Sequence, residues 1–325
     1  MRCCRTTFPP LRGSKVAAKL RVNTQGETVP LYKYLTPENT LRVLDGSVRF
    51  TQPGAFNDPF EMVPELHVPV DFEPKDISIS FDVLAPRRQP SVGDLAVDFE
   101  SDHCNDINSR NILSSLNRSI GILCLSKNES SLLMWSHYAG EYSGAVIEFD
   151  EEHEFFTGLF NVEYREHRPK KDISSYLSSE LPIPIAELCV KPKDWEYEKE
   201  YRIVRNLSDC KPVGEYDGFP VYVMDIPLEA IKSVTLGERM PVAIQRDIWN
   251  KIKNTNISLN LAAIANWGYE FRKEPIKYNL PVSDMNPLIS PRTAHIFSEL
   301  ENDFGEMARW MIKEHKLSSV ANHTL

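Results

Sequence analysis

Short apolar runs separated by polar turns are the main pattern between residues 31 and 275. Runs of a few apolar residues are typical of buried β-strands. They predict strands at residues 31–34, 48–50, 120–125, 144–150, 162–165, 221–226, 234–237, 257–261 and 269–275. Residues 195–206 instead alternate between polar and apolar side chains, which predicts one more strand with two different faces.

Helical signals lie between these strands and after them. Thr36, Pro37 and Gly46 supply an N-cap, a first-turn proline and a C-terminal stop, so a helix is predicted at residues 36–46. Further helices are predicted at residues 130–138, 242–253 and 292–316. The last is the longest, and its apolar residues recur at steps of three or four, so they share one face. These residues are Ile296, Leu300, Phe304, Met307 and Met311.

The order of the elements does not alternate regularly enough for a doubly wound parallel sheet. The predicted fold class is therefore α+β, with a mixed, largely antiparallel sheet and flanking helices. Residues 26–285 are predicted to form a single domain, with an irregular, proline-rich insertion near residues 64–118. Residues 1–25 are predicted to be a poorly ordered basic extension, and residues 286–325 an amphipathic helix and tail.

The charge is divided unevenly along the chain. The 325 residues carry a net charge of −9, but residues 1–25 contain six Lys or Arg and no acid, so −9 − 6 leaves −15 for residues 26–325. A body this negative disfavours non-specific binding of nucleic acid. The six cysteines are scattered, and no stretch reaches the roughly 18 to 20 apolar residues of a membrane helix. We therefore expect a cytoplasmic protein with no membrane association and no disulfide framework.

The most informative polar run is the predicted strand that contains Glu196, Glu198, Glu200 and Arg202. Their spacing of two places them on one face if the segment is extended. Neighbouring carboxylates repel, so this face needs a cation, a ligand or a raised pKa, and Arg202 compensates only in part. The alternative interpretation is a solvated strand face with weak surface ion pairs.

A second group of candidates follows the strand at residues 120–125. Ser126 ends that strand, and Trp135, His137 and Tyr138 follow on a predicted helix, where they could line a pocket. His137 is suited to acid or base chemistry near neutral pH. The alternative is that His137 and Trp135 are structural. No nucleophile elbow surrounds Ser126, so a covalent nucleophile is not predicted.

A metal site is not predicted. The sequence lacks HExxH, EF-hand, P-loop and GxGxxG motifs, and its 14 glycines form no glycine-rich phosphate loop. His103 and Cys104 are adjacent, but no second pair of ligands stands at metal-binding spacing.

Taken together, these segments resemble a large bacterial family of uncharacterised proteins, DUF2971. The pieces that carry the resemblance are Tyr32–Tyr34, Phe50–Pro53, Phe56–Glu61, Cys124–Ser126, Met134–Ala139, Tyr142–Asp150 and Trp195–Arg202. The resemblance covers roughly residues 30 to 275 and implies a bacterial cytosolic protein. The family supplies no activity.

A second resemblance, to the ADP-ribosyltransferase superfamily, does supply an activity. In that superfamily a first strand carries His or Arg, a middle strand carries a Ser motif, and a later strand carries Glu-x-Glu. Tyr32-Lys33-Tyr34, Cys124-Leu125-Ser126 and Glu198-Lys199-Glu200 stand in that order in this chain. The first strand departs from the pattern, because Lys33 and Tyr34 stand where His or Arg is usual.

The resemblance implies an enzyme that uses NAD as its substrate. Glu200 would hold the ribose hydroxyls and stabilise the oxocarbenium-like transition state, and Glu198 would orient the acceptor or act as a base. His137 is the third catalytic candidate. Five further side chains are expected to contact a phosphate or the nicotinamide ribose, or to stack on the nicotinamide ring: Lys33, Tyr34, Ser126, Trp135 and Tyr138.

Two main functional readings stay open. The first is an ADP-ribosyltransferase-like enzyme of the kind used by toxins or phage-defence effectors, acting on a protein, nucleic-acid or small-molecule acceptor, with an antitoxin or neighbouring-gene partner. The alternative is a non-catalytic binding or regulatory module with a degenerate nucleotide pocket. A hydrolase that combines His137 with one glutamate is a third reading without a motif behind it.

Overall fold

The architecture was analysed in a computed structural model that describes residues 30–67, 109–110, 113–114, 116–172 and 189–322. The predicted basic extension at residues 1–25 and most of the predicted insertion at residues 64–118 lie outside the described residues. Within the described part, no helix has the length and apolar character needed to cross a membrane.

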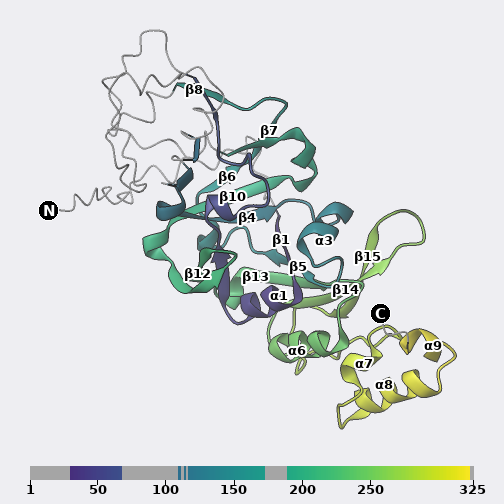
Figure 1. The fold of residues 1–325 in the computed structure, drawn as a ribbon. Helices are drawn as coiled ribbons and strands as arrows, with labels where there is room; N and C mark the ends of the chain where they lie inside the picture. The colour runs from purple at the N-terminus through teal and green to yellow at the C-terminus, as the bar shows by residue number, and fades with distance from the viewer. Residues whose placement is uncertain (1–29, 68–108, 111–112, 115, 173–188, 323–325) are drawn as a thin grey trace, which may run out of the picture.

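An eight-stranded mixed sheet forms the centre of the fold (Figure 1). Its strand order is β15-β14-β13-β5-β1-β4-β10-β6, and all neighbours pair antiparallel except β13 and β14, which are parallel. The strands, in that order, are Phe271–Lys277, Ser258–Ile264, Ile231–Leu236, Ala145–Phe149, Leu31–Leu35, Ile120–Ser126, Glu200–Asn206 and Leu159–Asn161. The predicted α+β class with a largely antiparallel sheet is confirmed.

Among the described residues, three smaller sheets accompany the large one. β2 (Ser47–Phe50), β11 (Lys211–Tyr216) and β12 (Phe219–Asp225) form an antiparallel sheet of three strands. Two parallel pairs complete the set, β3 (Glu65–His67) with β8 (Lys170–Asp172) and β7 (Glu163–Arg165) with β9 (Val190–Pro192). Short 3₁₀ helices connect the strands at Pro53–Ala55 (η2), Glu154–Phe156 (η5), Lys193–Glu198 (η6), Leu207–Asp209 (η7) and Leu228–Ala230 (η8).

The two faces of the central strands pack against different helices. On one face, α1 (Pro37–Leu44) and α6 (Val242–Ile252) contribute to the large apolar core, which includes Ile147 and Phe149 of β5. On the other face, α3 (Leu132–Tyr138) packs against β1 and forms a smaller aromatic core. Because both faces are covered, the central strands are apolar along most of their length, which is why short continuous runs predicted them.

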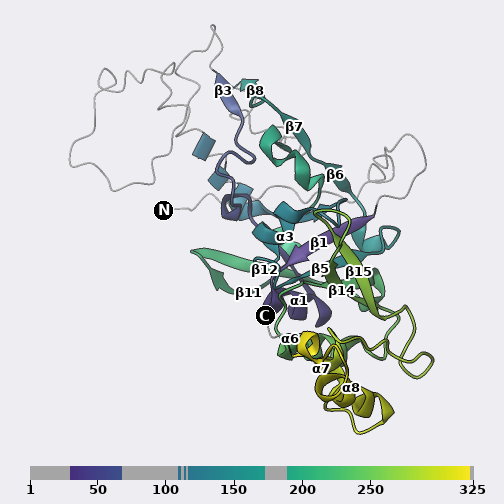
Figure 2. The same ribbon diagram turned by 90° about the vertical axis from the view of Figure 1, so that its right-hand side faces the viewer.

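The C-terminal tail is not one helix, so the prediction for residues 292–316 is wrong in this respect. It contains α7 (Ala294–Phe297), α8 (Asp303–Lys313) and α9 (Ser318–Ala321). Asn302 caps α8 by accepting a bond from the Gly305 backbone, and a Cβ on Gly305 would lie 1.8 Å from the Leu300 carbonyl oxygen. This tight turn ends the predicted helix, although the apolar residues on either side of it keep a helical spacing. The two views place α6, α7 and α8 at one end of the molecule, opposite β3, β7 and β8 (Figure 2).

The predicted strand at residues 195–206 is also corrected. Its first part forms η6, Lys199 adopts a left-handed conformation with φ 45°, and β10 starts at Glu200. Two bonds from the end of β4 fix this bend, because Ser126 donates to the Glu198 carbonyl and the Lys127 amide donates to the Lys199 carbonyl. These contacts outweigh the local alternation.

Candidate functional site

The three strands of the motif lie side by side in the main sheet. β4 is the neighbour of both β1 and β10, and Ser126 at its end lies opposite Tyr32 on one side and Glu200 on the other. Directly paired residues project from the same face of a sheet. Tyr32, Ser126 and Glu200 therefore form one row across three strands, on the face covered by α3.

A cluster of buried charges extends from this row. Lys191 of β9 places its Nζ 2.7 Å from Glu61, 2.7 Å from Glu198 and 3.5 Å from Glu200. Arg202 of β10 donates to Glu200 at 2.7 and 3.0 Å and to Glu61 at 2.6 Å. We call these five residues the charge cluster. Three carboxylates oppose two cations, so one negative charge is in excess when all five are ionised.

Burial makes this cluster energetically important. Arg202 is fully buried, Glu198 is 3% exposed and Glu200 is 5% exposed. Isolated charges at such positions would cost several kcal/mol each, so loss of any one partner should be strongly destabilising. The guanidinium of Arg202 also lies over the Phe56 ring, 5.2 Å from its centroid, and its Nη1 has no hydrogen-bond partner among the described residues.

The two glutamates of the motif differ in their ionisation. Burial disfavours the charge of Glu200, but Arg202 and Lys191 outweigh that penalty and lower its pKa to about 2. For Glu198 burial is the dominant influence and raises the pKa above its ordinary value, although Lys191 and Tyr138 oppose the effect. Glu200 is therefore a fixed anion, and Glu198 is the carboxylate better suited to exchange a proton.

Two strained backbone positions adjoin the cluster. Met62, next to Glu61, has φ 57°, and Lys199, between Glu198 and Glu200, has φ 45°. Residues other than glycine rarely adopt this backbone conformation, and strain of this kind often accompanies functional sites. At Lys199 the bend lets Glu198 and Glu200 both approach Lys191, although only Glu200 belongs to the strand.

Four ring side chains gather beside Glu198, and we call them the ring group. Tyr138 donates to Glu198 Oε1 at 2.5 Å and receives a bond from Asn57. The His137 ring lies 6.1 Å from Tyr138, 6.4 Å from Trp195 and 6.3 Å from Tyr197, measured between ring centroids. His137 is exposed, and its Nδ1 lies 3.1 Å from the Tyr197 hydroxyl. The ring group therefore connects solvent to the buried carboxylate.

The predicted dinucleotide contacts do not all meet in one place. Trp135 is buried in the aromatic core, 5.6 Å from Tyr34 between ring centroids. The Tyr34 hydroxyl donates to the Asn128 carbonyl, and the Lys33 ammonium donates to the Cys124 carbonyl. Lys33 also shares the alternation of Leu31 and Leu35, which face the large core rather than the Ser126 row.

The Ser126 hydroxyl is engaged by the backbone. Its Oγ donates to the Glu198 carbonyl at 2.5 Å and accepts the Asn128 amide at 2.9 Å. Ser126 thus holds the bend that presents Glu198 and Glu200.

Sequence reasoning missed two members of the charge cluster. Lys191 precedes the predicted strand, and Glu61 closes the aromatic turn at residues 56–61. The crowding of the glutamates was the available signal, because it required compensating cations beyond Arg202. A further missed residue is Tyr164, whose hydroxyl accepts the backbone N–H of Glu200 at 2.8 Å.

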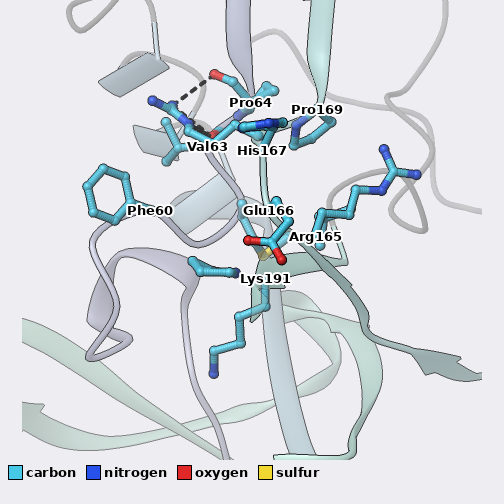
Figure 3. A pocket seen from close by; sticks show the side chains of 12 residues that line it. Phe60, Val63, Pro64, Arg165, Glu166, His167, Pro169 and Lys191 are labelled. Atoms are coloured by element: carbon cyan, nitrogen blue, oxygen red, sulfur yellow. Dashed lines mark hydrogen bonds between the residues drawn. The ribbon is translucent and has the colours of Figure 1, made fainter. Parts of the chain in front are cut away.

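A hollow opens beside the cluster, and Figure 3 shows the side chains that line it. It includes Phe60, Arg165, His167 and the stem of Lys191, while the Lys191 ammonium reaches Glu61 and Glu198. The cluster thus borders the ring group on one side and this hollow on another. Among the described residues, no group of three or more His, Cys, Asp or Glu is arranged to hold a metal ion.

Comparison with known proteins gives one match. Residues 134–203 match the model of a family described as "Protein of unknown function (DUF2971)". The matched segment contains the ring group, Lys191 and both glutamates of the motif, but not Tyr32, Glu61 or Ser126. The chain matches no curated protein and no solved structure.

Proposed function

We propose that this chain is an ADP-ribosyltransferase-like enzyme that cleaves NAD⁺, and that Glu198 acts at the reacting carbon. The observation that carries the proposal is the position of Glu198. Within the charge cluster its Oε2 accepts a bond from Lys191, and its Oε1 accepts one from Tyr138 of the ring group, which leads to solvent. The row of Tyr32, Ser126 and Glu200 supports the same reading, because it brings the three strands that carry the resemblance side by side.

The proposed reaction breaks the bond between the ribose C1′ and the nicotinamide nitrogen. The bonding electron pair leaves with nicotinamide and neutralises its ring, and C1′ passes through an oxocarbenium-like state. The lone pair of the acceptor then forms the new bond to C1′, and the proton of the acceptor passes to the Glu198 carboxylate. An anion beside C1′ stabilises the positive charge of the transition state, which is where catalytic binding energy is effective.

The other residues receive supporting roles in this proposal. Trp195 and Tyr197 offer ring faces, inclined by 38° to each other, against which a nicotinamide ring can stack. The ligand replaces the Tyr138 hydroxyl at Glu198 Oε1. Glu200 is a positioning residue rather than the group that contacts ribose, because Arg202 already occupies its oxygens.

The test is nicotinamide release from NAD⁺ by the purified chain, followed by chromatography. Glu198→Gln keeps the side-chain shape and should lower the rate at least 100-fold, in line with the usual contribution of acid–base and electrostatic groups. Glu196→Gln is the matched control, because Glu196 is exposed on the same 3₁₀ helix. Equal rates for the two variants, or no release by the unchanged chain with any acceptor, would refute the proposal.

A second candidate function is a non-catalytic binding or regulatory module. The burial of the charge cluster favours this function, because the carboxylates of Glu198 and Glu200 are almost fully buried and already paired with cations. This reading predicts that a nucleotide binds without release of nicotinamide and that Glu198→Gln leaves its affinity unchanged. Calorimetry with NAD⁺ beside the release assay separates the two functions.

The acceptor and the biological setting belong to the same proposal. An effector that modifies an essential acceptor should slow growth when expressed, and a neighbouring-gene antitoxin should relieve that effect. Expression of the unchanged chain and of Glu198→Gln in the same cells tests this, since only the former should inhibit growth.

A further inference from the structure

The hollow beside the charge cluster has the properties of a second binding site. It is bordered by the segment before β3, the turn from β7 to β8 and strand β9, and it is open to solvent, with an enclosed volume of about 60 Å³ (Figure 3). Binding sites for small molecules commonly have volumes of about 300–1,000 Å³. A ligand of nucleotide size would therefore lie mainly across the open part of the hollow.

The charge of the lining segment is opposite to that of the body. Residues 163–171 contain four Lys or Arg and two Glu, whereas residues 26–325 together carry −15. Both acids of this segment have cationic partners, because Glu163 pairs with Arg165 and Glu166 pairs with Lys193. The segment thus offers a local excess of positive charge to an anionic ligand.

The hollow also has an apolar side. Phe60 is 56% exposed and lies under the guanidinium of Arg168, 5.8 Å from the ring centroid. Arg168 is fixed by its bonds to the Val63 and Pro64 carbonyls, and Pro169 lines the hollow beside them (Figure 3). An exposed ring next to fixed cations suits a ligand that combines a planar base with phosphate.

The hollow and the charge cluster share structural elements. The Lys191 stem and Met62 line the hollow, while the Lys191 ammonium and the neighbouring Glu61 belong to the cluster. Lys33, the cation of the first strand, donates to the Cys124 carbonyl instead of facing the row with Ser126. A dinucleotide at the cluster therefore needs its phosphate contacts from another element, and the hollow is adjacent.

We propose that this hollow binds the adenosine diphosphate half of a dinucleotide, with Arg165 and His167 toward the phosphates and Phe60 against the adenine. The inference rests on the proposed function, because that function places the nicotinamide half beside Glu198. Arg165 should therefore contribute to the affinity for the nucleotide without taking part in the bond-breaking step.

The test is calorimetric titration of the full chain with ADP. Arg165→Gln should weaken ADP binding about tenfold, as expected for the loss of one charge-assisted contact, and Phe60→Ala should weaken it several-fold. Arg272→Gln is the matched control. Arg272 also pairs with a glutamate two residues away on a strand, and its side chain is 42% exposed against 45% for Arg165. The control should bind ADP within twofold of the unchanged chain.

Failure of this inference is distinguishable from failure of the proposed function. Absence of ADP binding, or equal affinities of Arg165→Gln and Arg272→Gln, would overturn the assignment of the hollow. If nicotinamide release still depends on Glu198 in that case, the proposed function stands alone. If ADP binding depends on Arg165 but nicotinamide is never released, the hollow is supported as a nucleotide site and the transferase proposal fails.

Discussion

Replacement of Glu200 by glutamine tests the electrostatic account of the charge cluster. The substitution keeps the size of the side chain and removes the negative charge that Arg202 and Lys191 stabilise. A pKa of about 2, against an ordinary value of 4.5, corresponds to about 3–4 kcal/mol in favour of the ionised form, at about 1.4 kcal/mol per pH unit. Glu200→Gln should therefore reduce the free energy of unfolding by about 3–4 kcal/mol at pH 7.

The stabilisation by Glu200 should depend on pH in a defined direction. The pKa of Glu200 is lowered in the folded chain, so its contribution is complete above the unfolded value of 4.5 and is lost as the pH falls toward about 2. The difference between the unchanged chain and Glu200→Gln should shrink across that range. Glu198 should behave in the opposite way, because burial raises its pKa and its ionised form costs stability at neutral pH.

Urea unfolding followed by tryptophan fluorescence, at pH values from 7 down to 3, measures these differences. Glu196→Gln provides the control for loss of one exposed negative charge and should change stability by less than about 0.5 kcal/mol. A Glu200→Gln variant within 1 kcal/mol of the unchanged chain at pH 7, or a difference that stays constant on acidification, would refute the assignment of Glu200 as a stabilised anion.

Three further substitutions test other parts of the account. Lys191→Met leaves three buried carboxylates with one cation, and should lower the free energy of unfolding by about 3–5 kcal/mol in urea titrations. A loss below 1 kcal/mol would contradict the central position of that ammonium. Ser126→Ala removes the bond to the Glu198 carbonyl and should cost about 1–3 kcal/mol by the same measurement, whereas no loss would show that Ser126 does not hold the bend. Lys199→Gly relieves a left-handed φ of 45° and should raise the thermal midpoint by a few degrees, equivalent to about 1 kcal/mol, and a lower midpoint would contradict the strain.

The sequence was sufficient to predict the helices and strands that local patterns specify. β4 and β5 are buried on both faces, so their apolar runs predicted strands, and Thr36 and Pro37 correctly marked the start of α1. The path of residues 193–199 was not predictable in the same way. Its alternation of glutamates and aromatic residues is that of a strand, but Ser126, more than seventy residues away in the chain, fixes the bend.

The candidate site was predictable only where one segment carries several of its members. Glu198, Glu200 and Arg202 are close in sequence, and their crowding indicated that cations were needed. Lys191 was missed because lysine is rarely buried and nothing beside it marks this one as an exception. Glu61 reaches Arg202 from 141 residues away, a pairing that only the fold establishes.

The most direct test of the central claim is the rate of nicotinamide release from NAD⁺, compared between the unchanged chain, Glu198→Gln and Glu196→Gln. The account predicts release by the unchanged chain, release at a similar rate by Glu196→Gln, and at least a 100-fold loss in a folded Glu198→Gln variant. Undiminished release by Glu198→Gln, or no release by the unchanged chain, would contradict it.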